Sequence, residues 1–169
     1  MKRTVRAVVA LSLLPVLALS AAHAAEIVRQ PLPDGNKFPI ARAVEVPAGF
    51  KIIFHSGFTP SPADPKAKEG TTAYWGDTKT QSMSVFSRME ESLKQMGLGF
   101  GDVVKMNVFL VGDPATGHMD FKGFMDAYTM HFGTREQPNL PARSAVQVAS
   151  LASAGVLVEV EVVLAKKSP

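Results

Sequence analysis

Apolar and polar residues alternate in several short runs of the chain, which is typical of β-strands. The clearest run covers residues 156–165. One side of it carries Val158, Val160, Val162 and Leu164, and the other carries Leu157, Glu159, Glu161 and Val163. A strand is also expected just after Pro141, joined to the last one by a short turn of small residues. Other strands are expected at 41–46, 51–57 and 102–111, and the first two of these read as a hairpin around the turn sequence Pro47-Ala48-Gly49.

Two segments instead repeat their apolar residues every three or four positions, which predicts helices at 78–96 and 119–132. The apolar stripe of the first is Met83, Phe86, Met89, Leu93 and Met96, and that of the second is Phe121, Phe124, Met125, Tyr128 and Phe132. Asp77 or Thr78 can cap the first helix, and Gly97 can end it. The order β-β-α-β-α-β-β therefore predicts an α+β domain with both helices packed on one face of a mixed sheet. The other face also carries apolar residues, so we expect a second subunit to bury it.

Two proline-broken segments are not expected to be regular. Residues 25–40 read as an irregular N-terminal arm, and residues 58–76 read as an unusually long loop. Two interpretations of the loop stay open. Either it is a surface insertion that Tyr74 and Trp75 anchor, or Trp75 helps to wall a pocket.

The first 24 residues have the pattern of a secretory signal peptide. Lys2, Arg3 and Arg6 precede an apolar stretch at 8–19, and Ala22-His23-Ala24 is a small-x-small cleavage site. The apolar stretch is too short to span a membrane. We therefore predict a periplasmic or secreted mature protein, with one domain at 25–169 and no membrane anchor after cleavage.

The charge of the mature chain excludes one class of partner. The full sequence of 169 residues has a net charge of +3, but its leader holds three bases and no acid, which leaves 15 basic and 15 acidic residues after it. No basic run is interleaved with aromatic residues, so nucleic acid is not an expected partner. The chain has no cysteine, so it forms no disulfide.

Arg143 and Glu159 are the strongest candidates for chemistry. The planar guanidinium of an arginine matches a carboxylate with two parallel hydrogen bonds. A carboxylate on an apolar strand, such as Glu159, can handle a proton near neutral pH. The plainer alternative is a structural ion pair of Arg143 with Glu161. Glu159 and Glu161 are expected on one face of their strand, roughly 7 Å apart.

Other signals for chemistry are weak. Ser56 and Gly57 end a strand, where a hydroxyl and a close backbone approach could serve a ligand. The histidines after the leader are scattered, with no pair at metal-ligand spacing and no serine-nucleophile motif.

The block Pro141-Ala142-Arg143-Ser144-x-x-x-Val148-Ala149-x-Leu151, followed by a strand with Glu159-x-Glu161, resembles the Rid (YjgF) family. The likeness extends over about residues 52–165. It includes the strand end Ser56-Gly57, Gln81, Gly97-Leu98 and Gly101-Asp102-Val103-Val104-Lys105.

This resemblance implies a chorismate-mutase-like fold and a homotrimer with ligand clefts between subunits. It also implies hydrolysis of 2-imino or enamine acids to 2-keto acids and ammonia without a metal or organic cofactor. Arg143 would hold the substrate carboxylate, and Glu159 would position the attacking water. Ser56, Gly57 and the backbone at Ala145 would line the cleft.

The chain departs from the family pattern at three positions. Ala145 stands where many members have a cysteine, Met125 where an asparagine is common, and Ile40 near a common tyrosine. Two functions therefore stay open: an exported imine or enamine deaminase, and a trimeric protein that binds small carboxylates without catalysis. A third function, ribonuclease activity, has been assigned to members of this family. The neutral charge of the mature chain disfavours it.

Overall fold

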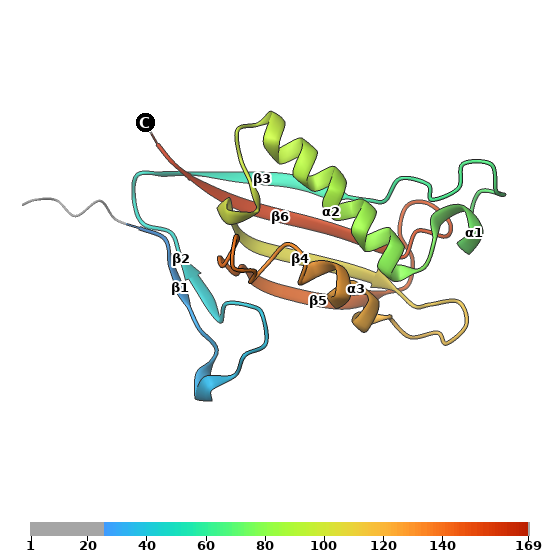
Figure 1. Ribbon diagram of the computed structural model, residues 1–169, viewed down its shortest axis with the longest axis horizontal. Coiled ribbons are helices and arrows are strands. Elements are labelled where there is room, and N and C mark those ends of the chain that lie inside the picture. Colours follow the sequence, from blue (N-terminus) through green and yellow to red (C-terminus); the bar gives the residue numbers. More distant parts are fainter. Residues whose placement is uncertain (1–25, 169) are drawn as a thin grey trace, which may run out of the picture.

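A computed structural model describes residues 26–168 of the chain (Figure 1). In chain order the elements are β1 (Val28–Gln30), η1 (Pro33–Gly35), β2 (Ala43–Glu45), β3 (Phe50–Phe58), α1 (Thr72–Trp75), α2 (Thr78–Gln95), η2 (Phe100–Asp102), β4 (Val103–Val111), α3 (Phe121–Tyr128), β5 (Ala142–Val148) and β6 (Val158–Lys167). The predicted signal peptide lies outside the described residues.

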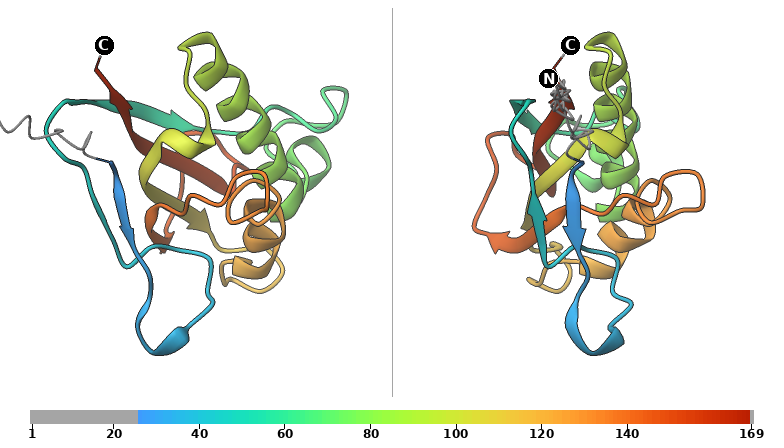
Figure 2. Two further views of the ribbon diagram at one scale, coloured as in Figure 1. Left: turned by 60° about the vertical axis from the view of Figure 1, so that its left-hand side comes forward. Right: turned by 90° about the vertical axis from the view of Figure 1, so that its left-hand side faces the viewer.

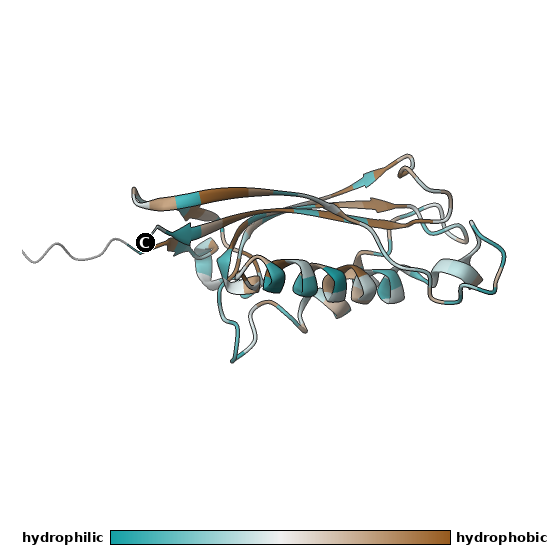
Figure 3. Ribbon diagram, turned by 90° about the horizontal axis from the view of Figure 1, so that it is seen from above, coloured by the Kyte–Doolittle hydropathy of each residue, from teal (hydrophilic) through white to brown (hydrophobic). Residues whose placement is uncertain are grey.

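A four-stranded mixed sheet forms the body of the molecule, in the order β3-β6-β4-β5. Strand β6 runs antiparallel to both β3 and β4, whereas β5 runs parallel to β4. Figures 2 and 3 show α2 and α3 side by side on one face of this sheet. The predicted α+β architecture, with two helices on one face of a mixed sheet, is confirmed.

The core lies between this face and the two helices. The four apolar residues that alternate along β6 (Val158, Val160, Val162 and Leu164) are all at most 1% exposed. They pack with Val85, Phe86, Met89 and Leu93 of α2. The alternation predicted for the last strand is confirmed. The apolar stripe predicted for α2, however, includes two residues that are not buried. Met83 is exposed because it lies beside the buried face of α2, which includes Ser82 and Val85, and Met96 is exposed because it follows the last helical residue.

The helix boundaries follow local signals. The Asp77 carboxylate caps α2 by accepting a 2.8 Å hydrogen bond from the Thr80 amide, and Gly97 ends that helix with a φ of 68°. Helix α3 ends at Tyr128, four residues earlier than predicted. The amides of Met130 and His131 bond to carbonyls three residues back, so the chain tightens into turns there.

The predicted hairpin of residues 41–46 with 51–57 is wrong. Strand β2 pairs with β1, while β3 pairs with β6 over most of its length. The long apolar β6 can bury one whole side of β3, which the short β2 cannot do. The arm at 25–40 is likewise not irregular throughout, because it contains β1 and η1.

Arg29 attaches this arm to the body. Its guanidinium donates to the carbonyls of Val103, Leu140 and Gly101 at 2.9, 2.7 and 3.0 Å. These three carbonyls lie far from Arg29 in sequence, so no local pattern predicts the contact.

The two C-terminal strands are not neighbours, although a short connection joins them. Strand β4 lies between β5 and β6 in the sheet. The connection therefore crosses the end of β4 instead of forming a tight hairpin.

Trp75 anchors the long loop at 58–76 to the body of the protein, which is the first of the two interpretations given above. The indole Nε1 donates to the Ala154 carbonyl at 2.8 Å, and the side chain is buried. Trp75 lies against the connection between β5 and β6. This contact favours the anchoring role.

Gln81 joins α2 to the same connection, and its loss is expected to destabilise the fold. Its amide donates to the carbonyls of Gly76 and Gly155 and accepts from the Leu157 amide at 2.7 Å. Gln81→Leu leaves three buried backbone groups without partners and should lower the free energy of unfolding by about 2–4 kcal/mol. Urea denaturation measures this. The exposed Gln95→Leu in the same helix is the control, and an equal loss in both variants would contradict the prediction.

Candidate functional site

Arg143 lies among aromatic rings on the helix-covered face of the sheet. In the parallel β4–β5 pair it is in register with the buried Met106, so its side chain points toward α3. Four rings surround the guanidinium; the distances from Cζ to their centroids are 4.2 Å for Tyr128, 5.3 Å for Phe124, 5.5 Å for Phe38 and 5.8 Å for Phe121. We call these four residues the aromatic cage. Ring faces at such distances attract a cation.

The guanidinium has almost no polar partner. Its Nη2 lies 3.1 Å from the Met125 sulfur, which is a weak acceptor, and its Nη1 is buried with no hydrogen-bond partner among the described residues. Burial lowers the pKa of Arg143, yet an arginine in a protein stays protonated. A cation with unused donors in a low-dielectric site favours an anionic ligand with two acceptor oxygens.

Tyr128 does not supply the missing negative charge. Burial raises its pKa to about 12, so its hydroxyl is neutral at physiological pH. This hydroxyl donates to the Pro39 carbonyl at 2.9 Å. The hydrogen bond also ties the cage to the N-terminal arm.

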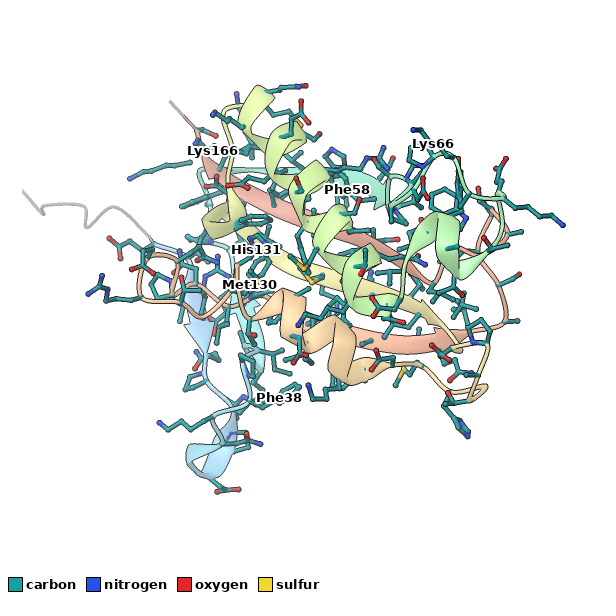
Figure 4. All side chains as sticks on the ribbon, turned by 45° about the vertical axis from the view of Figure 1, so that its right-hand side comes forward. Phe38, Phe58, Lys66, Met130, His131 and Lys166 are labelled. Atoms are coloured by element: carbon teal, nitrogen blue, oxygen red, sulfur yellow. The ribbon has the colours of Figure 1, made fainter. Side chains whose placement is uncertain are left out.

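Phe38 closes the cage from that arm. Its ring stacks on Phe121 with centroids 6.3 Å apart, and Figure 4 shows it between the arm and α3. The sequence placed a family tyrosine near Ile40 and assigned the aromatic residues of α3 to the core. The signal that could have identified the cage is the excess of rings, three in eight residues, on a helix that packs beside Arg143.

Glu159 and Gly57 meet on the other face of the sheet. A carboxyl oxygen of Glu159 occupies the space where a Cβ at position 57 would stand, and its Cγ lies 2.9 Å from that point. Only a glycine leaves this space free. Ser56 precedes Gly57 in β3, so the structure places Gly57 against Glu159 and Ser56 next to Gly57 in the chain.

Arg143 and Glu159 do not meet within one chain. Glu159 is in register with Phe109 of β4, whereas Arg143 is in register with Met106, three residues away on the same strand. Side chains alternate between faces along a strand, so the sheet itself separates the two groups. Ala145 is in register with the buried Val108, on the face of Arg143.

The same separation excludes the ion pair of Arg143 with Glu161 inside one chain. Glu161 shares the face of Glu159 and accepts a 3.2 Å hydrogen bond from the Asn107 side-chain amide. The candidate site thus consists of two halves, one around Arg143 and one around Glu159.

The sequence carries the signature of a known family. Residues 39–166 match the family model described as Endoribonuclease L-PSP. The chain belongs to the YjgF/Rid family. A RutC family protein of Pyrococcus abyssi is 31% identical over 139 residues, which cover 82% of this chain and 93% of that protein.

Solved structures agree on the fold. Escherichia coli TdcF with bound serine is 28% identical and covers 82% of this chain and 94% of its own, with a TM-score of 0.53. A putative endoribonuclease of Thermotoga maritima is also 28% identical, covers 83% and 94%, and has a TM-score of 0.52. The Rid protein YyfB of Yersinia pestis shares the fold at 20% identity, with coverage of 82% and 98% and a TM-score of 0.59. The predicted chorismate-mutase-like, YjgF-type fold is confirmed.

Two further findings limit the chemistry of residues 26–168. Within this range no three His, Asp or Glu side chains are grouped so that they could hold a metal ion. No helix of this part of the chain is long and apolar enough to cross a bilayer.

The two partly buried arginines, Arg29 and Arg143, are expected to respond differently to substitution. Arg29→Met removes three charge-assisted hydrogen bonds to carbonyls and should cost about 3 kcal/mol of unfolding free energy. Arg143→Met removes only a contact with sulfur and the ring contacts, and should change it by no more than about 1 kcal/mol. Chemical denaturation of both variants measures the difference. A loss at Arg143 as large as that at Arg29 would show that Arg143 serves the fold.

Proposed function

We propose that this protein hydrolyses imines or enamines of 2-amino acids to 2-keto acids and ammonia. The observation that carries the proposal is the Arg143 guanidinium, which is charged, enclosed by rings and without an acceptor for Nη1 among the described residues. Such a group has unused donors to offer a carboxylate. No metal or organic cofactor takes part in the proposed reaction.

Arg143 would bind the substrate carboxylate with two parallel hydrogen bonds. The aromatic cage keeps water away, and so strengthens the electrostatic attraction between the two groups. The relative TdcF is described with bound serine, which is itself an amino-acid carboxylate. This likeness supports a ligand of the same class here.

Glu159 would orient and deprotonate the attacking water. The water oxygen forms a bond to the imine carbon, and the resulting carbinolamine then loses ammonia as the C–N bond breaks and the keto group forms. Glu159 would take a proton from the attacking water and give it to the imine nitrogen, and would then carry the carbinolamine hydroxyl proton to the same nitrogen as ammonia leaves. Imine hydrolysis is intrinsically easy, so positioning and one proton-transfer group supply enough catalysis. Ser56, Gly57 and the backbone at Ala145 would line the rest of the cleft.

The site would be completed between subunits of a homotrimer. Arg143 and Glu159 lie on opposite faces of one sheet, so a single chain cannot place both beside one substrate. The face of Glu159 also presents apolar side chains: Phe54 is 81% exposed, Val146 47% and Ile52 44%. Exposed apolar side chains of this kind favour association with another copy. With the predicted signal peptide, the site would work outside the cytoplasm.

A carboxylate-binding protein without catalysis is the second candidate. Met125 meets the guanidinium where many relatives have an asparagine, and it brings no hydrogen-bonding amide to the site. Arg143 would then grip a ligand that Glu159 does not hydrolyse. The presence of both Arg143 and Glu159 favours the enzyme, because a protein that only binds a carboxylate needs no acidic residue at position 159.

Turnover of imino acids distinguishes the two candidates. The substrates are generated in place by an amino-acid oxidase, and release of the keto acid is followed with the mature protein. We expect clear acceleration over the uncatalysed rate, loss of at least about a hundredfold in Arg143→Ala, and a similar loss in Glu159→Gln. The control is Glu161→Gln, which should stay active. If the protein does not accelerate keto-acid release from several imino acids, and if it binds carboxylates in a way that requires Arg143, the second candidate is correct instead.

Mixing two inactive variants tests whether the site is shared. Arg143→Ala and Glu159→Gln chains are unfolded together and refolded, so that mixed oligomers form. Activity should return in the mixture, because some clefts then combine an intact Arg143 from one copy with an intact Glu159 from another. Each variant refolded alone is the control. A mixture as inactive as its parts would contradict a site between subunits.

A further inference from the structure

A cavity lies between the edge strand β3 and helix α2, and of the residues assigned to the proposed imine site only Gly57 lines it. It has a volume of about 460 Å³, and its lining residues are His55, Gly57, Phe58, Thr59, Arg88, Glu91, Ser92 and Gln95. Of these, His55 and Ser92 are in direct contact. From this pair we infer a second catalytic centre, a Ser92–His55 dyad that transfers the acyl group of a small ester to water.

Both ring nitrogens of His55 are engaged. Nδ1 lies 2.8 Å from the Ser56 carbonyl oxygen, and Nε2 lies 2.9 Å from the Ser92 hydroxyl oxygen. The Phe58 ring stacks on the imidazole, with centroids 4.2 Å apart and planes inclined by 20°. Figure 4 shows Phe58 at the level of α2, in keeping with this contact. The ring of His55 is thus held in place from three sides.

These contacts determine the tautomer of the neutral imidazole. A carbonyl oxygen has no proton to give, so Nδ1 must carry the proton and donate it to Ser56. Nε2 then has a free lone pair and accepts from the Ser92 hydroxyl. A nucleophile bonded to a base, with the base oriented by a third group, is the arrangement that activates serine hydroxyls in acyl transfer.

The cavity also holds a cation. Arg88 precedes Ser92 by one helical turn on the same side of α2, and its guanidinium donates to the Thr59 carbonyl. Its remaining donors can stabilise the negative charge that develops on the carbonyl oxygen of an ester under attack. The residues around it are mainly polar, so the cavity suits a short acyl group and not a long fatty chain.

The proposed reaction has two balanced steps. In the first, Ser92 Oγ forms a bond to the acyl carbon while His55 Nε2 takes its proton. The ester C–O bond then breaks, and the leaving alcohol receives that proton. In the second, water attacks the acyl-serine, gives its proton to His55, and releases the acid as Ser92 regains a proton. No oxidant, reductant or cofactor is needed.

The dyad uses neither Arg143 nor Glu159, although Ser56, whose carbonyl orients His55, and Gly57 also belong to the proposed imine cleft. Ser92 and His55 lie at the β3 edge, whereas Arg143 lies on β5 at the opposite edge of the sheet. Sequence spacing does not predict the dyad, because His55 and Ser92 are 37 residues apart and belong to different elements.

p-Nitrophenyl acetate turnover by the full mature protein tests the proposal. Steady release of p-nitrophenolate should fall by about 10²–10⁴-fold in Ser92→Ala and at least about a hundredfold in His55→Gln. The matched control is Ser87→Ala, at an exposed serine of the same helix without a His55 contact, and it should keep full activity. Mass spectrometry of protein quenched during turnover should place the acetyl group on Ser92.

Each other outcome would overturn the dyad. A wild-type rate equal to the uncatalysed rate excludes it, and so does unchanged turnover in Ser92→Ala. Acetylation of lysines alone means that the ester reacts with the surface and not with this centre. Urea denaturation of Ser92→Ala, compared with wild type, shows whether the variant protein is intact, and imine turnover of both proteins is measured in parallel. The imine proposal can therefore fail or stand separately from this one.

Discussion

The alternation of side chains along β6 is the constraint on which the rest of this structure depends. This strand lies inside the sheet, between β3 and β4. Val158, Val160 and Val162 face the helices and build the core, while Glu159 and Glu161 face the other side. Because the period is two, a slip of one residue would bury both carboxylates and expose the core residues. Stability and chemistry are therefore coupled in one strand.

The same geometry separates the two groups that a hydrolytic site would need. The Arg143 side chain lies on the helix-covered face of the sheet, and the Glu159 side chain lies on the open face. A fold with one helix-covered face and one open apolar face gives a physical reason for association, because the open face carries Phe54 and its apolar neighbours. In the proposed trimer, the surface that drives assembly is also the surface that carries one half of the site.

Arg29 and Arg143 differ in what surrounds their guanidinium groups, and this difference supports the ligand-binding role proposed for Arg143. Both guanidinium groups are largely withdrawn from water, and burial lowers the pKa of each. Arg29 has exchanged its water for three carbonyls of the body. Arg143 has only rings and the Met125 sulfur around it. A cation held this way keeps its hydrogen-bonding capacity for a ligand. Burying a cation without acceptors costs stability, and functional sites tolerate such a cost.

The sequence by itself predicted most of the local elements and the candidate site residues. Periodicity located α2, α3 and strands β2 to β6, but not β1, since burial of one face acts over a few neighbouring residues. The block around Arg143 and the strand that carries Glu159 led to the family, the fold class and the candidate residues of both site halves. Residue type alone already indicated that Arg143 suits a carboxylate.

Only the tertiary structure decided which strands pair and which faces the side chains share. The hairpin expected from the turn at 47–49 is replaced by the β3–β6 pair, because long-range burial outweighs a local turn signal. The same holds for the insertion of β4 between β5 and β6, for the cage that Phe38 completes, and for the contact between His55 and Ser92. Each joins residues far apart in the chain. Their proximity arises from packing, which a local pattern does not encode.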